Sequence, residues 1–135
     1  MRVFLDTNVL VSAFASRGIC ADILELILLE HDLIVGENVL KELRKALRLK
    51  VRLPIDQTSE IVDFVAGEAT AVIREAGPAD AKADPEDALV LGEALSGQAR
   101  MFVTGDAALL RLGAIEQLAI VSPRDFWDAL REGSL

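Results

Sequence analysis

Short apolar runs alternate with longer segments of helical periodicity along the whole chain. The apolar runs predict strands at residues 2–6, 33–35, 70–74, 101–103 and 119–121. Apolar positions at three- to four-residue spacing predict helices at residues 9–15, 21–30, 37–52, 56–67, 85–96, 107–112 and from 123 onward. Strands separated by helices pair in parallel, so the pattern predicts a three-layer α/β/α sandwich with a mostly parallel central sheet.

The length and composition of the chain indicate how many domains it forms and in which compartment we expect it. A chain of 135 residues with 52% hydrophobic residues fits one domain, residues 1–135, with a well-filled core. No apolar run approaches the ~20 residues of a membrane span, and Asp6 interrupts any signal-peptide core. The single cysteine, Cys20, has no internal disulfide partner, so we expect a reducing cytoplasm.

Two apolar strands are each followed by an aspartate. Asp6 follows the first strand, and Asp106 closely follows the strand at 101–103. Chemistry in an open α/β sheet gathers outside the carboxyl ends of the strands. Asp87 lies on the inward face of the 85–96 helix, and Glu42 lies at the margin of a buried helical stripe. These four acids are therefore candidates for one site at that edge.

A cluster of three or four carboxylates needs a cation. The negative charges repel one another and raise each other's pKa unless positive charge compensates. Oxygen ligands of this kind suit Mg²⁺ or Mn²⁺, and we expect Asp6, Asp87 and Asp106 to hold the metal. Such a centre performs metal-assisted hydrolysis or transfer at phosphorus.

Each acid also has a structural interpretation. Either strand-end aspartate can be a helix N-cap, and Glu42 can form an exposed helical ion pair with Lys45. Asp84 fits an N-cap before Pro85, which favours Asp87 as the ligand, although Asp84 can also contribute through water.

The order and spacing of four motifs resemble the PIN domain, with the nearest likeness to VapC-type toxins of prokaryotic type II toxin–antitoxin systems. The motifs are LDTNVL at 5–10, the helix of Glu42, DPED at 84–87 and VTGD at 103–106. The resemblance covers residues 1 to about 130 and implies a divalent-metal-dependent endoribonuclease that leaves 5′-phosphate and 3′-hydroxyl ends. Carried over by position, the acidic pocket consists of Asp6, Glu42, Asp87 and Asp106, with Asn8 and Thr104 as polar supports. The same resemblance implies a small antitoxin partner and a homodimer.

The net charge of −8 argues against a protein that wraps nucleic acid through overall positive charge, but the basic residues are unevenly distributed. Six of the 14 Lys and Arg residues fall within residues 41–52. Five of them are predicted to share one helical face and to bind RNA phosphates: Lys41, Arg44, Lys45, Arg48 and Arg52.

Three other classes of protein share part of this pattern. A PIN scaffold can bind RNA or protein without cleaving, and a PIN nuclease can process RNA outside any toxin–antitoxin system. A phosphatase or response-regulator-like domain also places an aspartate after its first strand. The chain has no DxD at that point and no paired acid beside Asp6, and it contains no phosphate-binding glycine loop.

Overall fold

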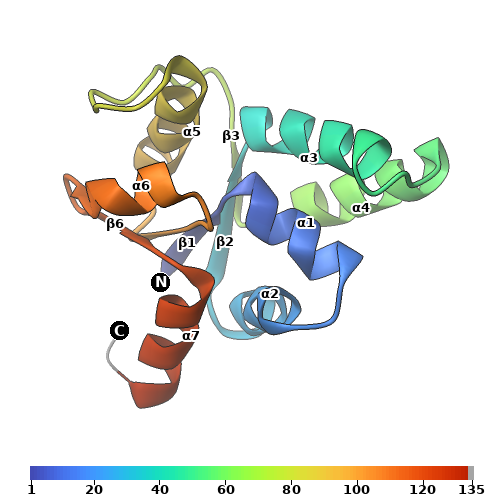
Figure 1. Cartoon of the computed structure of the whole chain (residues 1–135), viewed down its shortest axis with the longest axis horizontal. Coiled ribbons are helices and arrows are strands. Elements are labelled where there is room, and N and C mark those ends of the chain that lie inside the picture. The colour runs from blue at the N-terminus through green and yellow to red at the C-terminus, as the bar shows by residue number, and fades with distance from the viewer. Residues whose placement is uncertain (134–135) are drawn as a thin grey trace.

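A six-stranded sheet forms the centre of the computed structural model, which describes residues 1–133 (Figure 1). Its strands are β1 (Arg2–Leu5), β2 (Asp32–Gly36), β3 (Ala71–Ile73), β4 (Met101–Val103), β5 (Ala114–Ile115) and β6 (Leu118–Val121). The strand order is β3-β2-β1-β4-β6-β5, and every neighbouring pair is parallel except β5–β6. The predicted sandwich with a mostly parallel sheet is confirmed.

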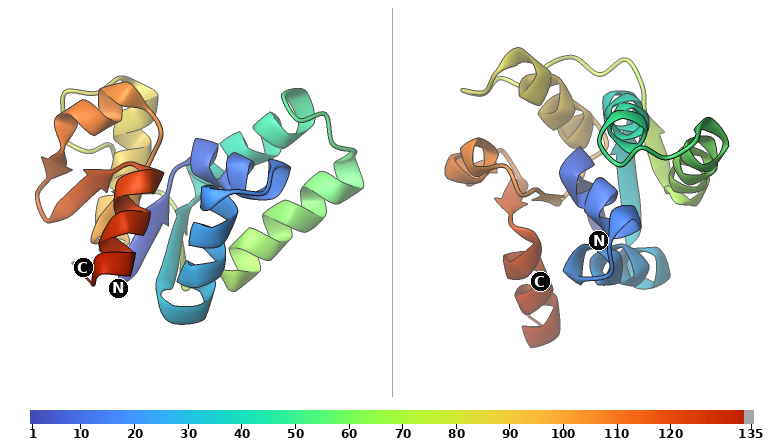
Figure 2. Two further views of the ribbon diagram at one scale, coloured as in Figure 1. Left: turned by 60° about the horizontal axis from the view of Figure 1, so that its bottom comes forward. Right: turned by 45° about the vertical axis from the view of Figure 1, so that its right-hand side comes forward.

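Seven helices in the described residues surround this sheet. They are α1 (Thr7–Ala15), α2 (Ile19–Glu30), α3 (Glu37–Leu49), α4 (Ile55–Glu68), α5 (Pro85–Ser96), α6 (Ala107–Leu112) and α7 (Pro123–Glu132). Helix α1 packs on α2 and α3, α2 packs on α7, and α3 packs on α4, whereas α5 lies against β2 and β3 (Figures 1 and 2). In the described part of the chain, no helix has the length and apolar character that would let it cross a membrane.

Strands β1 and β4 form the middle of the core and set the position of the site. Their register pairs Phe4 with Phe102, and the two buried rings stack with centroids 5.3 Å apart. The same register pairs Leu5 with Val103 at the carboxyl ends. Because parallel strands end at the same edge, the residues that follow these two strands lie side by side.

Helix α3 is shorter than its sequence pattern predicts. It ends at Leu49, where the prediction continued to Arg52. The backbone amide of Leu53 donates a hydrogen bond to the carbonyl of Leu47 (2.9 Å), and Arg52 has a left-handed backbone conformation with φ 65°. The predicted helical face therefore does not include Arg52, because the chain has left the helix before Pro54.

Other boundaries differ by a few residues. Helices α1 and α2 begin at Thr7 and Ile19, each two residues earlier than predicted. The apolar residues at positions 23, 24 and 26–29 favour a largely buried helix, but Leu29 on α2 is 75% exposed. The two-residue strand β5 was not predicted, because so short a segment carries no periodicity.

Candidate active site

Asp6 and Thr104 meet where β1 and β4 end. The backbone amide of Asp6 donates to the carbonyl of Val103 (3.0 Å), which continues the sheet by one residue. The hydroxyl of Thr104 then donates to Oδ2 of Asp6 (2.6 Å). Both side chains are buried, with exposed fractions of 8% for Asp6 and 0% for Thr104. A carboxylate is thus held at the edge of the sheet by a hydroxyl that has no access to solvent.

The two interpretations of Asp6 are compatible, because its two oxygens have different partners. Oδ1 accepts from the backbone amide of Thr7 (2.9 Å), so Asp6 caps helix α1. Oδ2 accepts from Thr104 and from the side-chain amide of Asn8 (3.3 Å). Asn8 in turn accepts from the backbone amide of Gly105 (3.0 Å). The helix cap therefore orients the carboxylate within the site.

Asp106 is joined to the same network through Thr104. Its backbone amide donates to the hydroxyl oxygen of Thr104 (3.0 Å), and its Oδ1 accepts from the amide of Leu109 (3.1 Å) as the N-cap of α6. Thr104 thus donates to one aspartate and accepts from the backbone of the other. This arrangement fixes the relative positions of Asp6 and Asp106.

Asp87 approaches the pair from the first turn of α5. Asp84 is the N-cap of this helix, as predicted, and it accepts from the backbone amide of Asp87 (2.9 Å). The Asp87 side chain is half-buried. Burial, followed by the negative charges of Asp84, Asp106 and Asp6, raises the pKa of Asp87 to about 6. The three predicted metal-ligating aspartates therefore lie close enough for their charges to interact.

The pKa of Asp6 is also raised. Burial is the main cause and the charge of Asp106 adds to it, while the hydrogen bonds from Thr104, Thr7 and Asn8 oppose the shift. Hydrogen bonds to the ionised form thus only partly offset the loss of solvation. An ionised Asp6 remains costly in the protein alone.

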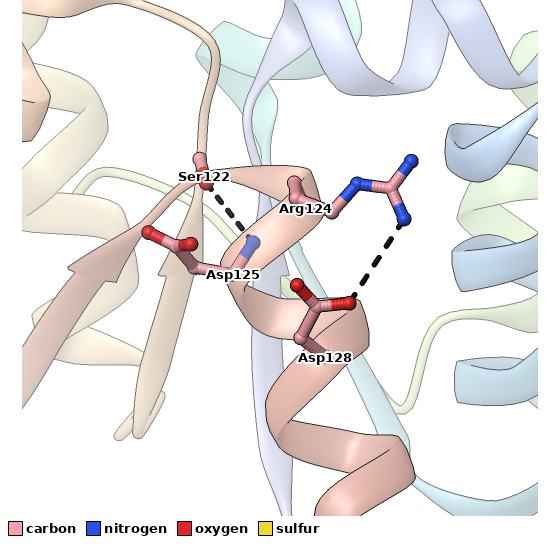
Figure 3. A network of polar contacts seen from close by, with 4 residues as sticks. All are labelled: Ser122, Arg124, Asp125 and Asp128. Atoms are coloured by element: carbon pink, nitrogen blue, oxygen red, sulfur yellow. Dashed lines mark hydrogen bonds and ion pairs between the residues drawn. The ribbon is translucent and has the colours of Figure 1, made fainter.

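In the part of the chain that the structure describes, no lysine or arginine forms an ion pair with these acids. Within residues 1–133, the one ion pair is Arg124–Asp128 (3.9 Å) on the exposed side of α7, shown in Figure 3 beside the Ser122 N-cap. Basic nitrogens in the described chain therefore lie more than 4.0 Å from the carboxylates of Asp6, Asp87 and Asp106. No ion pair within residues 1–133 therefore compensates the negative charge of this edge.

Glu42 is attached to the site by one contact. It is half-buried on α3, and its Oε2 accepts from the hydroxyl of Thr7 (2.8 Å). The alternative ion pair with Lys45 does not form in the described residues. Thr7, which follows Asp6 in the chain, was not among the predicted site residues. A contact between residues 35 positions apart leaves no signal in a single sequence.

The donor set fits a hydrated divalent cation. Carboxylate, amide and hydroxyl oxygens suit Mg²⁺ or Mn²⁺. Across residues 1–133, no three His, Cys, Asp or Glu side chains converge closely enough to form a ready-made metal shell. Mg²⁺ is commonly held by one or two carboxylates and keeps several waters, so Asp6, Asp87 and Asp106 fit such an ion with some of the contacts made through water.

Two clefts border the site, one beside Asp87 and the other beside Asp106. One, of about 420 Å³, is lined by Asp84 and Asp87 together with Lys82 and the apolar side of α6. The other, of about 300 Å³, is lined by Asn8 and Asp106, with Cys20 at its wall. Asp87 and Asp106 therefore each border a cleft that opens to solvent, whereas Asp6 is buried and lines neither cleft.

The basic residues predicted to bind RNA do not all share one face. Lys41, Lys45 and Arg48 are exposed on α3, and Arg44 is exposed but donates to the hydroxyl of Ser59 (3.1 Å). Arg52 lies beyond the end of the helix. The basic face of α3 consists of Lys41, Arg44, Lys45 and Arg48, on the helix that also carries Glu42.

Glu93 is a buried acid that the sequence did not reveal. Its side chain is fully buried on α5, and its Oε2 accepts from the backbone amide (2.8 Å) and side-chain amide (3.0 Å) of Asn38. Burial raises its pKa, and Oε1 has no hydrogen-bond partner in the described residues. A Cβ at Gly36 would overlap this carboxyl group. Glu93 therefore holds the N-terminus of α3, which has no capping side chain of its own, against α5.

The fold and the site define a class of α/β protein in which parallel strands bring uncompensated aspartates to one edge of the sheet. The PIN domain family model matches residues 2–108, so the chain belongs to the PIN domain family and the resemblance is confirmed. One chain in the crystal structure of VapBC2 from Rickettsia felis, bound to a DNA fragment from their promoter, has a similar fold. The TM-score is 0.65 over 90% of this chain and 98% of that chain, at 18% identity. No curated protein sequence matches this chain.

Proposed function

We propose that this protein is a divalent-metal-dependent endoribonuclease that hydrolyses RNA phosphodiester bonds. The observation that carries the proposal is the group of Asp6, Asp87 and Asp106. The charge of Asp106 contributes to the raised pKa of Asp6, the charges of both contribute to the raised pKa of Asp87, and none of the three forms an ion pair in the described residues. Such a group is stabilised when a Mg²⁺ or Mn²⁺ ion binds. Membership of the PIN domain family supports the same function.

The side chains around the site have different roles in the proposed reaction. A bound divalent ion would supply a water of lowered pKa and screen the charge of the phosphate. Thr104 and Asn8 hold the Asp6 carboxylate in a fixed orientation. Glu42 stands at the margin of the site as an acceptor for a water proton, and the backbone of Asp106 is fixed by Thr104. No side-chain nucleophile is needed for this chemistry.

The experiment that tests this chemistry compares the wild-type chain with Asp6→Asn on a mixed RNA pool. Cleavage is expected with Mn²⁺ or Mg²⁺, and it should be lost in EDTA and in the variant. Asparagine is a good N-cap, so the variant should keep the start of α1. Asp63→Asn, at an exposed position on α4, is the matched control and should cleave normally. Cleavage that persists in EDTA and in Asp6→Asn would refute the proposal, and RNA binding without cleavage would identify the non-catalytic binding module.

We further propose that RNA phosphates bind along the basic face of α3. Removing two phosphate contacts with Lys45→Ala and Arg48→Ala should weaken RNA binding and reduce the slope of log affinity against log salt by about 1.4 for single-stranded RNA. The measurement is a binding titration at several salt concentrations. Lys82→Ala, at the cleft that Asp84 and Asp87 line, serves as a comparison. An unchanged slope would show that the α3 charges are only a solvated surface.

The biological role that we propose is the toxin of a type II toxin–antitoxin pair, acting in the cytoplasm as a homodimer with a small antitoxin partner. Support comes from the similarity in fold to a chain of VapBC2 and from large apolar side chains that are exposed, including Leu49, Ile55 and Phe64. Expression of the chain alone should arrest growth, and co-expression of a small protein encoded immediately beside it should relieve the arrest. Normal growth with an active nuclease would favour an RNA-processing role.

A further inference from the structure

Thr7 touches two acids of the proposed site at once. Its backbone amide donates to Oδ1 of Asp6 (2.9 Å), and its hydroxyl donates to Oε2 of Glu42 (2.8 Å). It is the first residue of α1, whereas Glu42 lies in α3, which packs against α1. Thr7 is therefore the contact through which the α3 acid is connected to the edge of the sheet.

Glu42 differs from the aspartates in how it is held. Asp6 and Asp106 each cap a helix, so a backbone amide holds each of their carboxylates, and the backbone of Asp87 is fixed by the Asp84 cap. Glu42 lies in the middle of α3 with a long side chain that local backbone does not restrain. The Thr7 hydroxyl supplies the missing restraint.

A competing position for the Glu42 carboxylate exists on the same helix. Lys45 lies one turn away and is exposed, and a Glu–Lys pair at this spacing is favourable on a helix surface. The structure has the Thr7 contact and, within residues 1–133, no ion pair between Glu42 and Lys45. Threonine is suited to this role because its branched side chain restricts χ1, which limits the positions that the hydroxyl oxygen can take.

We propose that Thr7 is a positioning residue, whose hydroxyl turns Glu42 toward the aspartates and away from Lys45, so that the charge of Glu42 contributes to binding of a divalent cation. This inference rests on the function proposed above. It assigns Thr7 no contact with the metal or with RNA. The hydroxyl acts only through the carboxylate that it orients.

The test is Mn²⁺ affinity, measured by calorimetric titration of the metal-free protein. Replacing a group that hydrogen-bonds a metal-site residue typically weakens metal binding by about 10-fold or more, and we expect a loss of about 10-fold in Thr7→Val. Thr7→Ser keeps the hydroxyl and should bind Mn²⁺ within about 2-fold of wild type, since the residual cost is only a less rigid side chain. In a Glu42→Gln background, Thr7→Val should have no further effect, because the charge that it orients is absent.

Thr70→Val is the matched control. Thr70 also donates its hydroxyl to an acid, Asp32 (3.2 Å), on the exposed surface at the start of β2. This variant should leave Mn²⁺ affinity unchanged, which separates the site from a general effect of losing a threonine–carboxylate bond. Far-UV circular dichroism and a melting curve check that each variant is folded at the titration temperature. If Thr7→Val is not folded, Thr7→Ala, which has no branched methyl to place, takes its position in the same cycle.

Three results would overturn the inference. Wild-type affinity in Thr7→Val would show that the hydroxyl does not orient Glu42 for the metal. An equal loss in the presence and absence of the Glu42 charge would show that Thr7 acts by another route. If the wild-type chain itself binds no Mn²⁺, the proposed function fails and this inference fails with it, an outcome distinct from the first two.

Discussion

Asp87→Asn should make the metal-free protein more stable at neutral pH. Burial and three neighbouring aspartates raise the pKa of Asp87 from 3.8 to about 6. Below about pH 4 the carboxyl is protonated in the folded and unfolded states. As the pH rises through about 6, ionisation disfavours the folded state, so the wild-type chain loses stability that the asparagine variant keeps.

The gain in the free energy of unfolding follows from the size of the shift in the pKa of Asp87. The full shift corresponds to an upper limit of about 3 kcal/mol at 1.36 kcal/mol per pKa unit. The Asp87 side chain is only half-buried, so solvent screening reduces the effect to about 1 kcal/mol. For a chain of this length, that gain raises Tm by about 3–5 °C.

The assay is thermal unfolding in EDTA across pH 4 to 8, for wild type, Asp87→Asn and the exposed control Asp63→Asn. The Tm advantage of Asp87→Asn should be near zero at pH 4, develop as the pH rises toward 6, and stay constant above about 7. Addition of Mn²⁺ should raise the Tm of wild type more than that of the variant. Equal stability of wild type and variant at pH 7.5, or an advantage as large at pH 4, would contradict the argument.

Two other substitutions test the contacts of Thr104 in the site and the close approach of Gly36 to Glu93 beneath α3. Thr104→Val removes the donor to Asp6 and the acceptor for the Asp106 amide; it should lower the free energy of unfolding by about 1–3 kcal/mol in urea titrations, and Thr104→Ser should recover most of it. Gly36→Ala should destabilise the fold by about 2 kcal/mol or more, because its Cβ would overlap the Glu93 carboxyl, and the loss should be smaller when Glu93→Ala is already present. Additive losses at positions 36 and 93 would refute the proposed overlap.

The elements that the sequence predicted well are those with local signals. The helix α6 has the predicted bounds, and α5 begins at Pro85 behind its Asp84 cap, because the capping residues are adjacent in the chain. The strands β1 and β4 were found from their apolar runs. The end of α3 was missed because the bond from Leu53 back to Leu47 depends on geometry beyond the helix.

The site was predicted less completely, for a related reason. The convergence of Asp6 with Asp106 follows from parallel strands ending at one edge, which a sequence pattern can indicate. The contact of Thr7 with Glu42 and the burial of Glu93 join helices that are distant in the chain. An acid on a helix has the same appearance in sequence whether it faces water or a neighbouring helix, so Glu93 was not distinguished from a surface charge.

Asp6 has two roles, as the N-cap of α1 and as an acid of the site, and this has an evolutionary consequence. One oxygen begins helix α1 and the other belongs to the acidic pocket. An asparagine would preserve the first duty and remove the charge required by the second. Under the proposed function, a single nucleotide change can therefore turn the nuclease into a folded, inactive RNA- or protein-binding relative, without a passage through unstable intermediates.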